Sequence, residues 1–280
     1  MKRPVRNAQP LRKFPGRIVL LGAGKMGFAM LEGWLAQGLD PRKLVILEPQ
    51  PVNAVKSLRR RGVALNPKGK STAATAIVIA VKPQSAPDAL GALAPFVGRS
   101  TLAISIMAGR TIAFVETRLP PHTAIVRAMP NTPASIGRGI TVACPNGHVT
   151  ARQRKQASDL LAAIGKVEWI GDEALMDAVT ALSGSGPAYI FLLAEAMANA
   201  GIAAGLPPAL ATRLARETVA GSGELLHRSE LDHVTLRKNV TSPGGTTAAA
   251  LEVLMGPGGF DELLTKAIAA ATRRSRELAG

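Results

Sequence analysis

The chain has few aromatic residues and few acidic ones. Phe, Trp and Tyr make up 3% of its 280 residues, so it lacks the side chains on which proteins stack unpaired bases. Lys and Arg number 34 against 19 Asp and Glu, which gives a net charge of +15. These cations are spread over a basic N-terminal tail, residues 59–61 and the C-terminal segment 273–276. Without one basic domain, we expect no nucleic-acid partner.

The chain also lacks the residues that other classes of protein need. Its only cysteine, Cys144, excludes an intrachain disulfide and gives no sign of an oxidising compartment. The four histidines do not have metal-ligand spacing, and no catalytic triad is visible, so we predict no metal site. The apolar run at 18–21 breaks at once into glycines, unlike a signal peptide. The cytoplasm is the default location.

The longest apolar stretch, residues 178–206, does not predict a membrane span. Glu195 is its only formal charge, but Ser183-Gly184-Ser185-Gly186-Pro187 interrupts it. A helix that is apolar on nearly every side must be buried on nearly every side. We therefore expect the centre of a helical domain, packed against a second subunit, and no membrane association.

The order of apolar and helical segments predicts two domains after a flexible basic extension at 1–15. Residues 16–170 alternate short apolar strands with helices, which is typical of a Rossmann-type dinucleotide-binding domain with a parallel sheet covered on both faces. Residues 171–280 form an all-α domain for substrate binding and dimerisation. We predict strands at 17–21, 43–47, 77–81, 101–106, 124–129 and 167–170, with a possible edge strand at 141–143. Predicted helices are 25–37, 52–61, 151–164, 174–182, 187–204, 208–227, 231–238, 247–254 and 259–278.

A glycine loop directly follows the first predicted strand and opens the first helix. In this setting, Gly22-Ala23-Gly24-Lys25-Met26-Gly27 matches the dinucleotide fingerprint. One glycine makes the tight turn, one admits the pyrophosphate and one lets the helix pack closely. The loop therefore predicts a nicotinamide cofactor.

The end of the second strand bears on the form of that cofactor. Glu48 stands where an acidic side chain accepts hydrogen bonds from the ribose 2′-OH and repels a 2′-phosphate, which favours NADH. Lys56 and the arginines at 59–61 follow it, and they either reach a 2′-phosphate or complement the helix dipole. We leave the choice between NADPH and NADH open.

Two later strands end in proline-containing turns. Ala80-Val81-Lys82-Pro83 ends the third strand at the carboxyl edge of the sheet, where ligands bind in such folds. Lys82 is a catalytic base, a cofactor contact or a surface lysine, and we favour a turn that lines the cofactor. In Met129-Pro130-Asn131-Thr132-Pro133, Asn131 either holds a substrate or caps the turn.

The segment 241–247 is the most informative stretch of the chain. Thr241-Ser242-Pro243-Gly244-Gly245-Thr246-Thr247 combines hydroxyl residues and paired glycines and opens into a helix. Backbone N–H groups and the positive end of the helix dipole then point at one spot, which suits a carboxylate or a phosphate. Alternatively, Thr246 or Thr247 merely caps the helix.

Together these blocks closely resemble pyrroline-5-carboxylate reductase over about residues 17–278. Leu182-Ser183-Gly184-Ser185-Gly186-Pro187-Ala188-Tyr189 and Asn239-Val240 leading into the loop above are the most specific. The resemblance implies a Rossmann domain and an interlocking helical domain that forms a dimer, often assembled into a decamer. It also implies NAD(P)H-dependent reduction of 1-pyrroline-5-carboxylate to L-proline, the last step of proline biosynthesis.

The resemblance further implies roles for individual residues. Substrate binding falls to Glu173, Ser242, Gly245, Thr246 and Thr247. Thr247 is the catalytic candidate, hydrogen-bonding the imine nitrogen, while the proton comes from solvent. The cofactor-binding set is Gly22, Ala23, Gly24, Lys25, Met26, Gly27, Glu48, Ala80, Val81, Lys82, Pro83, Met107, Ala108 and Asn239.

Two other functions compete with this interpretation. A hydroxy-acid dehydrogenase would carry a catalytic lysine on its long helix, whereas residues 187–204 contain none. A non-catalytic NADPH-binding protein would keep the glycine loop and lose the loop at 242–247, which is intact here.

Overall fold

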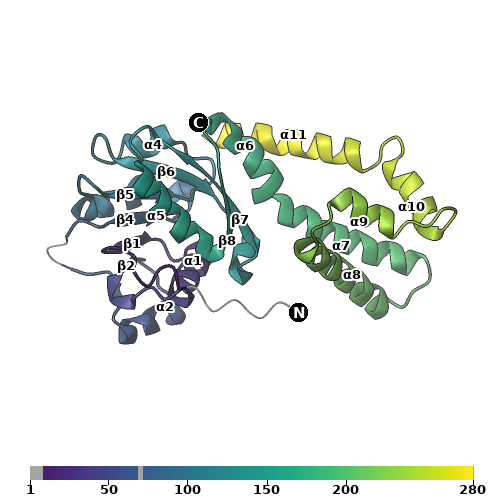
Figure 1. Cartoon of the computed structure of the whole chain (residues 1–280), viewed down its shortest axis with the longest axis horizontal. Coiled ribbons are helices and arrows are strands. Elements are labelled where there is room, and N and C mark those ends of the chain that lie inside the picture. Colours follow the sequence, from purple (N-terminus) through teal and green to yellow (C-terminus); the bar gives the residue numbers. More distant parts are fainter. Residues whose placement is uncertain (1–8, 69–71, 280) are drawn as a thin grey trace. The chain divides into compact units, whose positions relative to one another are not determined.

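The computed structural model describes residues 9–68 and 72–279, and its contacts divide the chain into two units (Figure 1). The second unit is Ser185–Ala271, and the first contains the residues before it and the end of the last helix from Thr272. The predicted boundary near residue 170 lies inside the first unit. Residues 173–184 belong there because Met176 is 1% exposed and packs in a core of that unit.

An eight-stranded sheet forms the first unit among the residues described, in the order β3-β2-β1-β4-β5-β6-β7-β8 (Figure 1). The first six strands are parallel, as predicted for five of them, whereas the two-residue β3 was not predicted. However, β7 runs antiparallel to β6, and β8 pairs outside β7, so the segment predicted as an edge strand is internal. The strands are β1 Ile18–Leu21, β2 Leu44–Leu47, β3 Ala64–Leu65, β4 Ala76–Ile79, β5 Leu102–Ser105, β6 Ala124–Met129, β7 Gly139–Pro145 and β8 Gly165–Trp169.

Helices cover both faces of this sheet because alternate strand residues point to opposite faces. Ile18 and Leu20 of β1 join one core with α1, α2 and α5, while Val19 and Leu21 join the other with α3 and α4. The covering helices are α1 Lys25–Ala36, α2 Asn53–Ser57, α3 Ala86–Ala89, α4 Ile112–Glu116 and α5 Ala151–Leu161. The helix predicted at 52–61 is shorter, because Leu58–Arg61 tightens into a 3₁₀ turn that ends at left-handed Gly62.

The predicted N-terminal extension is partly folded. Residues 1–8 lie outside the described part of the chain. Leu11 is 0% exposed and Phe14 is 3% exposed, both in the core with α1. The backbone carbonyl of Phe14 also accepts a hydrogen bond from Lys43 Nζ at 2.6 Å. Burial of these two apolar side chains therefore makes residues from Leu11 onward part of the domain.

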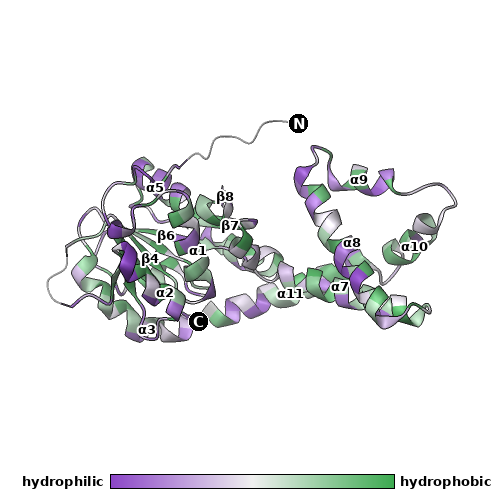
Figure 2. Ribbon diagram, turned by 90° about the horizontal axis from the view of Figure 1, so that it is seen from below, coloured by the Kyte–Doolittle hydropathy of each residue, from purple (hydrophilic) through white to green (hydrophobic). Residues whose placement is uncertain are grey.

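The second unit is helical, and its longest apolar helix is not covered. Figure 2 colours much of α7 as hydrophobic. Even so, α7 contains no buried residue, and Phe191 and Leu192 are 68% and 63% exposed. α7 packs against α8 through small residues such as Gly201 and Ala211. In the part of the chain described, no helix has the length and apolarity to cross a membrane. The helices are α7 Gly186–Ala203, α8 Pro208–Arg228, α9 His233–Asn239, α10 Thr246–Met255 and α11 Phe260–Ala279, the last of which continues into the first unit, where α6 Met176–Val179 also lies.

Candidate active site

The three glycines of the loop after β1 differ in what surrounds them. Gly22 has φ +90°, and a Cβ there would lie 2.8 Å from the carbonyl oxygen of Ala80, so the tight turn requires glycine. A Cβ on Gly27 would strike the carbonyl oxygen of Gly22, so α1 can approach the strand only with glycine there. Gly24 differs, because nothing lies within 4 Å of its Cβ position. Open space at Gly24 fits a cofactor pyrophosphate.

Gly24 is also the N-cap of α1, and no side chain caps that helix. The first-turn N–H groups of an uncapped helix lack intrahelical partners and attract anions. Lys25 and Met26 supply the first of these groups. The local geometry of the loop therefore fits the dinucleotide that the fingerprint predicts.

Glu48 follows β2, the neighbour of β1, and its carboxylate is already engaged with the glycine loop. Oε2 accepts a hydrogen bond from Ala23 N–H at 2.8 Å, and Oε1 accepts one from Gln50 N–H at 3.0 Å. Asn66 fixes the backbone of the same residue, accepting from Glu48 N–H and donating to its carbonyl. A negative charge thus lies beside the predicted pyrophosphate loop.

The remaining predicted cofactor residues follow β4 and β5 at the same carboxyl edge. Ala80 N–H donates to Leu21 O, which ties the turn of Ala80 and Val81 to the end of β1. Lys82 is exposed, and the carbonyl of Pro83 accepts from Arg110 Nη2 at 3.3 Å. Beyond β5, Met107 is buried and Ala108 is exposed. The strand order places β1 between β2 and β4, so one edge brings together all these turns.

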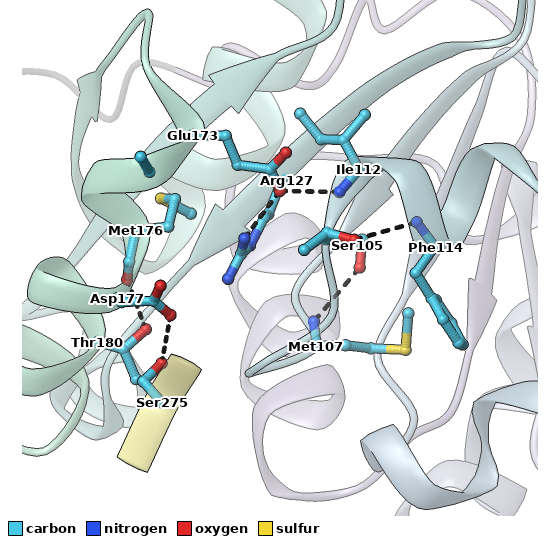
Figure 3. A network of polar contacts seen from close by, with 12 residues as sticks. Ser105, Met107, Ile112, Phe114, Arg127, Glu173, Met176, Asp177, Thr180 and Ser275 are labelled. Carbon is cyan, nitrogen blue, oxygen red and sulfur yellow. Dashed lines mark hydrogen bonds and ion pairs between the residues drawn. The ribbon is translucent and has the colours of Figure 1, made fainter. Parts of the chain in front are cut away.

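Glu173, predicted to contact substrate, is held inside the first unit (Figure 3). Its Oε1 accepts a hydrogen bond from Arg127 Nη1 at 2.8 Å and another from Ile112 N–H at 2.8 Å. The Arg127 side chain is 6% exposed and that of Glu173 is 29% exposed. Glu173 thus joins β6 to the start of α4. Its substrate role stays a prediction.

Arg127 was missed by the sequence interpretation, although it is the only charge within the apolar strand β6. A cation in such a strand needs an anionic partner. Cys144 lies on the neighbouring strand and pairs with Arg127 in the register. Burial raises the pKa of the Cys144 thiol, and the Glu173 carboxylate raises it further. The thiol therefore stays neutral and belongs to the core.

Asn131, left open between substrate binding and a turn, has structural partners. Its Oδ1 accepts from Ile140 N–H at 3.0 Å, and its amide donates to Ser183 Oγ at 3.4 Å. These bonds connect the loop after β6 with β7 and with the serine–glycine segment. Asn131 stands at the N-cap of the 3₁₀ turn Thr132–Ile136, but its side chain does not cap that turn, so the capping alternative is wrong. A substrate role for Asn131 stays a prediction.

In the second unit, the loop at 241–245 leads directly into α10. Thr241 closes α9, because its hydroxyl donates to the Arg237 carbonyl at 2.7 Å. Gly245 N–H donates to Ser242 O at 3.0 Å, and Gly244 takes φ +68°, which favours glycine. These contacts turn the chain sharply into the helix. Asn239, the predicted cofactor contact, is the exposed last residue of α9.

The capping alternative for Thr246 and Thr247 is wrong. Gly245 is the N-cap of α10, and no side chain caps the helix. Thr246 is exposed and Thr247 is half-buried. Because their hydroxyls do not cap, they and the first-turn N–H groups are left for another partner.

Two segments of the chain match models of known protein families. Residues 17–109 match the family model "NADP oxidoreductase coenzyme F420-dependent", and residues 173–278 match "Pyrroline-5-carboxylate reductase dimerisation". The pyrroline-5-carboxylate reductases of Pseudomonas aeruginosa and Mycobacterium tuberculosis are each 39% identical to this chain. They cover 94% of it, aligned over 97% and 96% of their own lengths.

Solved structures give the same likeness in three dimensions. A pyrroline-5-carboxylate reductase from Coxiella burnetii has 34% identity and a TM-score of 0.86. A pyrroline carboxylate reductase from Plasmodium falciparum, solved with NADP bound, has 30% identity and a TM-score of 0.78. Each covers 95% of this chain and 99% of its own.

Proposed function

The chain belongs to the pyrroline-5-carboxylate reductase family, and we infer that it reduces the C=N bond of 1-pyrroline-5-carboxylate to give L-proline. The observation that carries this function is the uncapped start of α10, with two threonine hydroxyls beside free helix N–H groups. An anion and a polar ring atom on one small molecule match that combination. The open position at Gly24 supports NADPH or NADH as the cofactor, which supplies the hydride when bound.

In the proposed mechanism, different residues of the loop before α10 and of its first turn bind the carboxylate and the ring nitrogen of the substrate. Ser242, Gly245 and Thr246 hold the carboxylate through hydroxyl and N–H donors at the positive end of the helix. Thr247 hydrogen-bonds the imine nitrogen, since a hydroxyl both donates and accepts. The imine carbon gains the hydride with its electron pair, and the nitrogen gains one proton. A threonine hydroxyl is a poor acid at neutral pH, so solvent supplies that proton.

The family resemblance also implies a role for Glu173 in the first unit and for Asn239 in the second. One oxygen of Glu173 is used by Arg127 and Ile112, which orients the carboxylate and leaves its other oxygen as the acceptor for substrate. Asn239 contacts the cofactor from the end of α9.

Mixing purified protein with 1-pyrroline-5-carboxylate, and following the absorbance of NADH and NADPH separately, tests the activity. We expect proline formation in step with cofactor oxidation. If neither cofactor is oxidised above background, the reductase function is wrong. Oxidation with 2-keto acids but not with the imine would instead indicate a hydroxy-acid dehydrogenase.

Replacing Glu48 changes the cofactor preference. Its carboxylate lies at the glycine loop and repels a 2′-phosphate. We expect Glu48→Ser to raise the ratio of kcat/KM for NADPH over NADH about tenfold, or about 1.4 kcal/mol. Glu48→Gln keeps an acceptor for Ala23 N–H and removes only the charge. An unchanged ratio in both variants would show that Glu48 does not face the ribose.

A second copy of the chain covers the exposed apolar side chains of α7 in the dimer that we propose. Phe191 and Leu192 are too exposed for a stable surface without a partner. We expect a light-scattering mass of twice the 29.1 kDa chain, or ten times that mass if dimers assemble into a decamer. Phe191→Glu lowers the mass toward the monomer, whereas Ala92→Glu, an exposed site in the first unit, leaves it unchanged. Equal masses for both variants would exclude α7 from the interface.

We also propose a cytoplasmic location, which is supported by a single cysteine that allows no intrachain disulfide.

A further inference from the structure

A cavity of about 470 Å³ opens at the amino-terminal edge of the sheet. Its lining comes from the segments that lead into β4, β5 and β6 and from the start of α5. The polar side chains that matter here are Arg99, His122, His148, Arg152, Gln153 and Gln156. The glycine loop and the Ala80 turn lie at the opposite, carboxyl edge. The four residues of β4 separate the two edges by about 13 Å at 3.3 Å per residue, so this cavity is distinct from the cofactor site.

The charge around this cavity has one sign. Arg99 and Arg152 line it, and no carboxylate does so among the residues described. The rings of His122 and His148 lie 5.1 Å apart, nearly perpendicular to each other. His122 takes φ 63°, a backbone conformation that non-glycine residues seldom adopt. The start of α5 adds the positive end of a helix dipole, although Thr150 and Gln153 already form a capping box there.

Gln156 adds a polar side chain that has no partner in the described part of the protein. Its side chain lines the cavity and is 7% exposed, yet it makes no hydrogen bond within the described chain. Gln153, one turn earlier, is fully used: its Oε1 accepts from Thr150, and its amide donates to the Ser100 carbonyl. The amide atoms of Gln156 are open to the cavity, so a ligand that enters it can accept from and donate to them.

We propose that this cavity binds a small phosphate-bearing molecule through Arg99, Arg152 and the amide of Gln156. The planar guanidinium groups match phosphate oxygens in pairs. The volume exceeds what inorganic phosphate fills and lies within the range of small-metabolite pockets. The site is independent of the reductase activity, since none of its residues belongs to the cofactor or substrate set.

Isothermal titration calorimetry of the full chain, with its nucleotide site saturated by NADP⁺, tests the proposal. The probes are inorganic phosphate, ribose 5-phosphate and citrate. We expect saturable binding of ribose 5-phosphate, weaker binding of inorganic phosphate, and little binding of citrate. Tighter binding of inorganic phosphate would assign the site to the free ion. Citrate binding as tightly as either phosphate, or no saturable heat up to about 10 mM probe, would overturn the phosphate assignment.

Three variants locate the binding. Arg152→Gln weakens ribose 5-phosphate binding at least tenfold. Arg154→Gln removes the same charge from the same helix, but Arg154 stacks on Trp169 outside the cavity, so we expect affinity within about twofold of wild type, as for a screened surface charge. Gln156→Leu keeps the volume and removes the unpartnered amide. It abolishes the rise in melting temperature that ribose 5-phosphate gives to wild type. Equal weakening by the two arginine variants, or unchanged affinity in Gln156→Leu, would overturn the site.

Discussion

Thr247→Ala lowers kcat for imine reduction by more than tenfold, which corresponds to at least about 1.4 kcal/mol of barrier. The structure separates this effect from folding. Thr247 is the second residue of α10, whose N-cap is Gly245 and which uses no side-chain cap. Alanine is also the better helix former. The variant therefore keeps its stability and loses only the hydroxyl that we assign to the imine nitrogen. Steady-state rates and thermal unfolding of the same preparation measure both quantities.

Two further variants control this experiment. Thr247→Ser keeps a hydroxyl and retains most of the turnover. Thr212→Ala removes a threonine hydroxyl from α8, where it donates to the Pro208 carbonyl at 2.9 Å, and leaves kcat unchanged. Wild-type kinetics in Thr247→Ala would remove Thr247 from the mechanism. The same loss in Thr212→Ala would assign the effect to the helical unit as a whole.

The features that the sequence predicts well are those determined by adjacent residues. The three glycines of 22–27 serve the turn, the open approach and the helix packing, and each role follows from its position next to a strand and a helix. The loop at 241–247 is local in the same way. In both loops the backbone conformation itself requires glycine or proline, so the positions of these residues in the sequence predict the turns.

Partners distant along the chain could not be predicted in this way. Glu173 meets Arg127 and Ile112, which are 46 and 61 positions away. That pairing depends on how β6 and α4 pack, and no local pattern records it. The reversal of β7 and the burial of Leu11 and Phe14 are likewise products of tertiary packing, which overrides the local signals of short segments. The burial that the sequence predicts for α7 cannot be checked in one chain, because a single chain leaves its apolar side chains exposed.

Gly24→Ala raises the KM for NADPH and NADH at least tenfold while the protein stays folded. The backbone of Gly24 has φ −67° and ψ −170°, which alanine adopts without strain. Its Cβ position has no protein atom within 4 Å, so we expect the free energy of unfolding to change by less than about 1 kcal/mol. A methyl group there occupies the approach of the cofactor pyrophosphate to the helix N-terminus. Initial rates at varied cofactor concentration, together with fluorescence titration of NADPH, measure the loss.

Gly91→Ala is the matched control, because Gly91 also has no atom within 4 Å of its Cβ position and lies in the 3₁₀ helix Leu90–Phe96, outside the predicted cofactor set. It leaves KM unchanged. Gly27→Ala provides the opposite case, since its Cβ meets the Gly22 backbone and the variant loses stability as well as cofactor affinity. If Gly24→Ala binds NADPH as wild type does, the pyrophosphate does not approach at Gly24. If it unfolds like Gly27→Ala, the glycine serves packing rather than binding. Only a loss of affinity without a loss of stability assigns the open space to the cofactor.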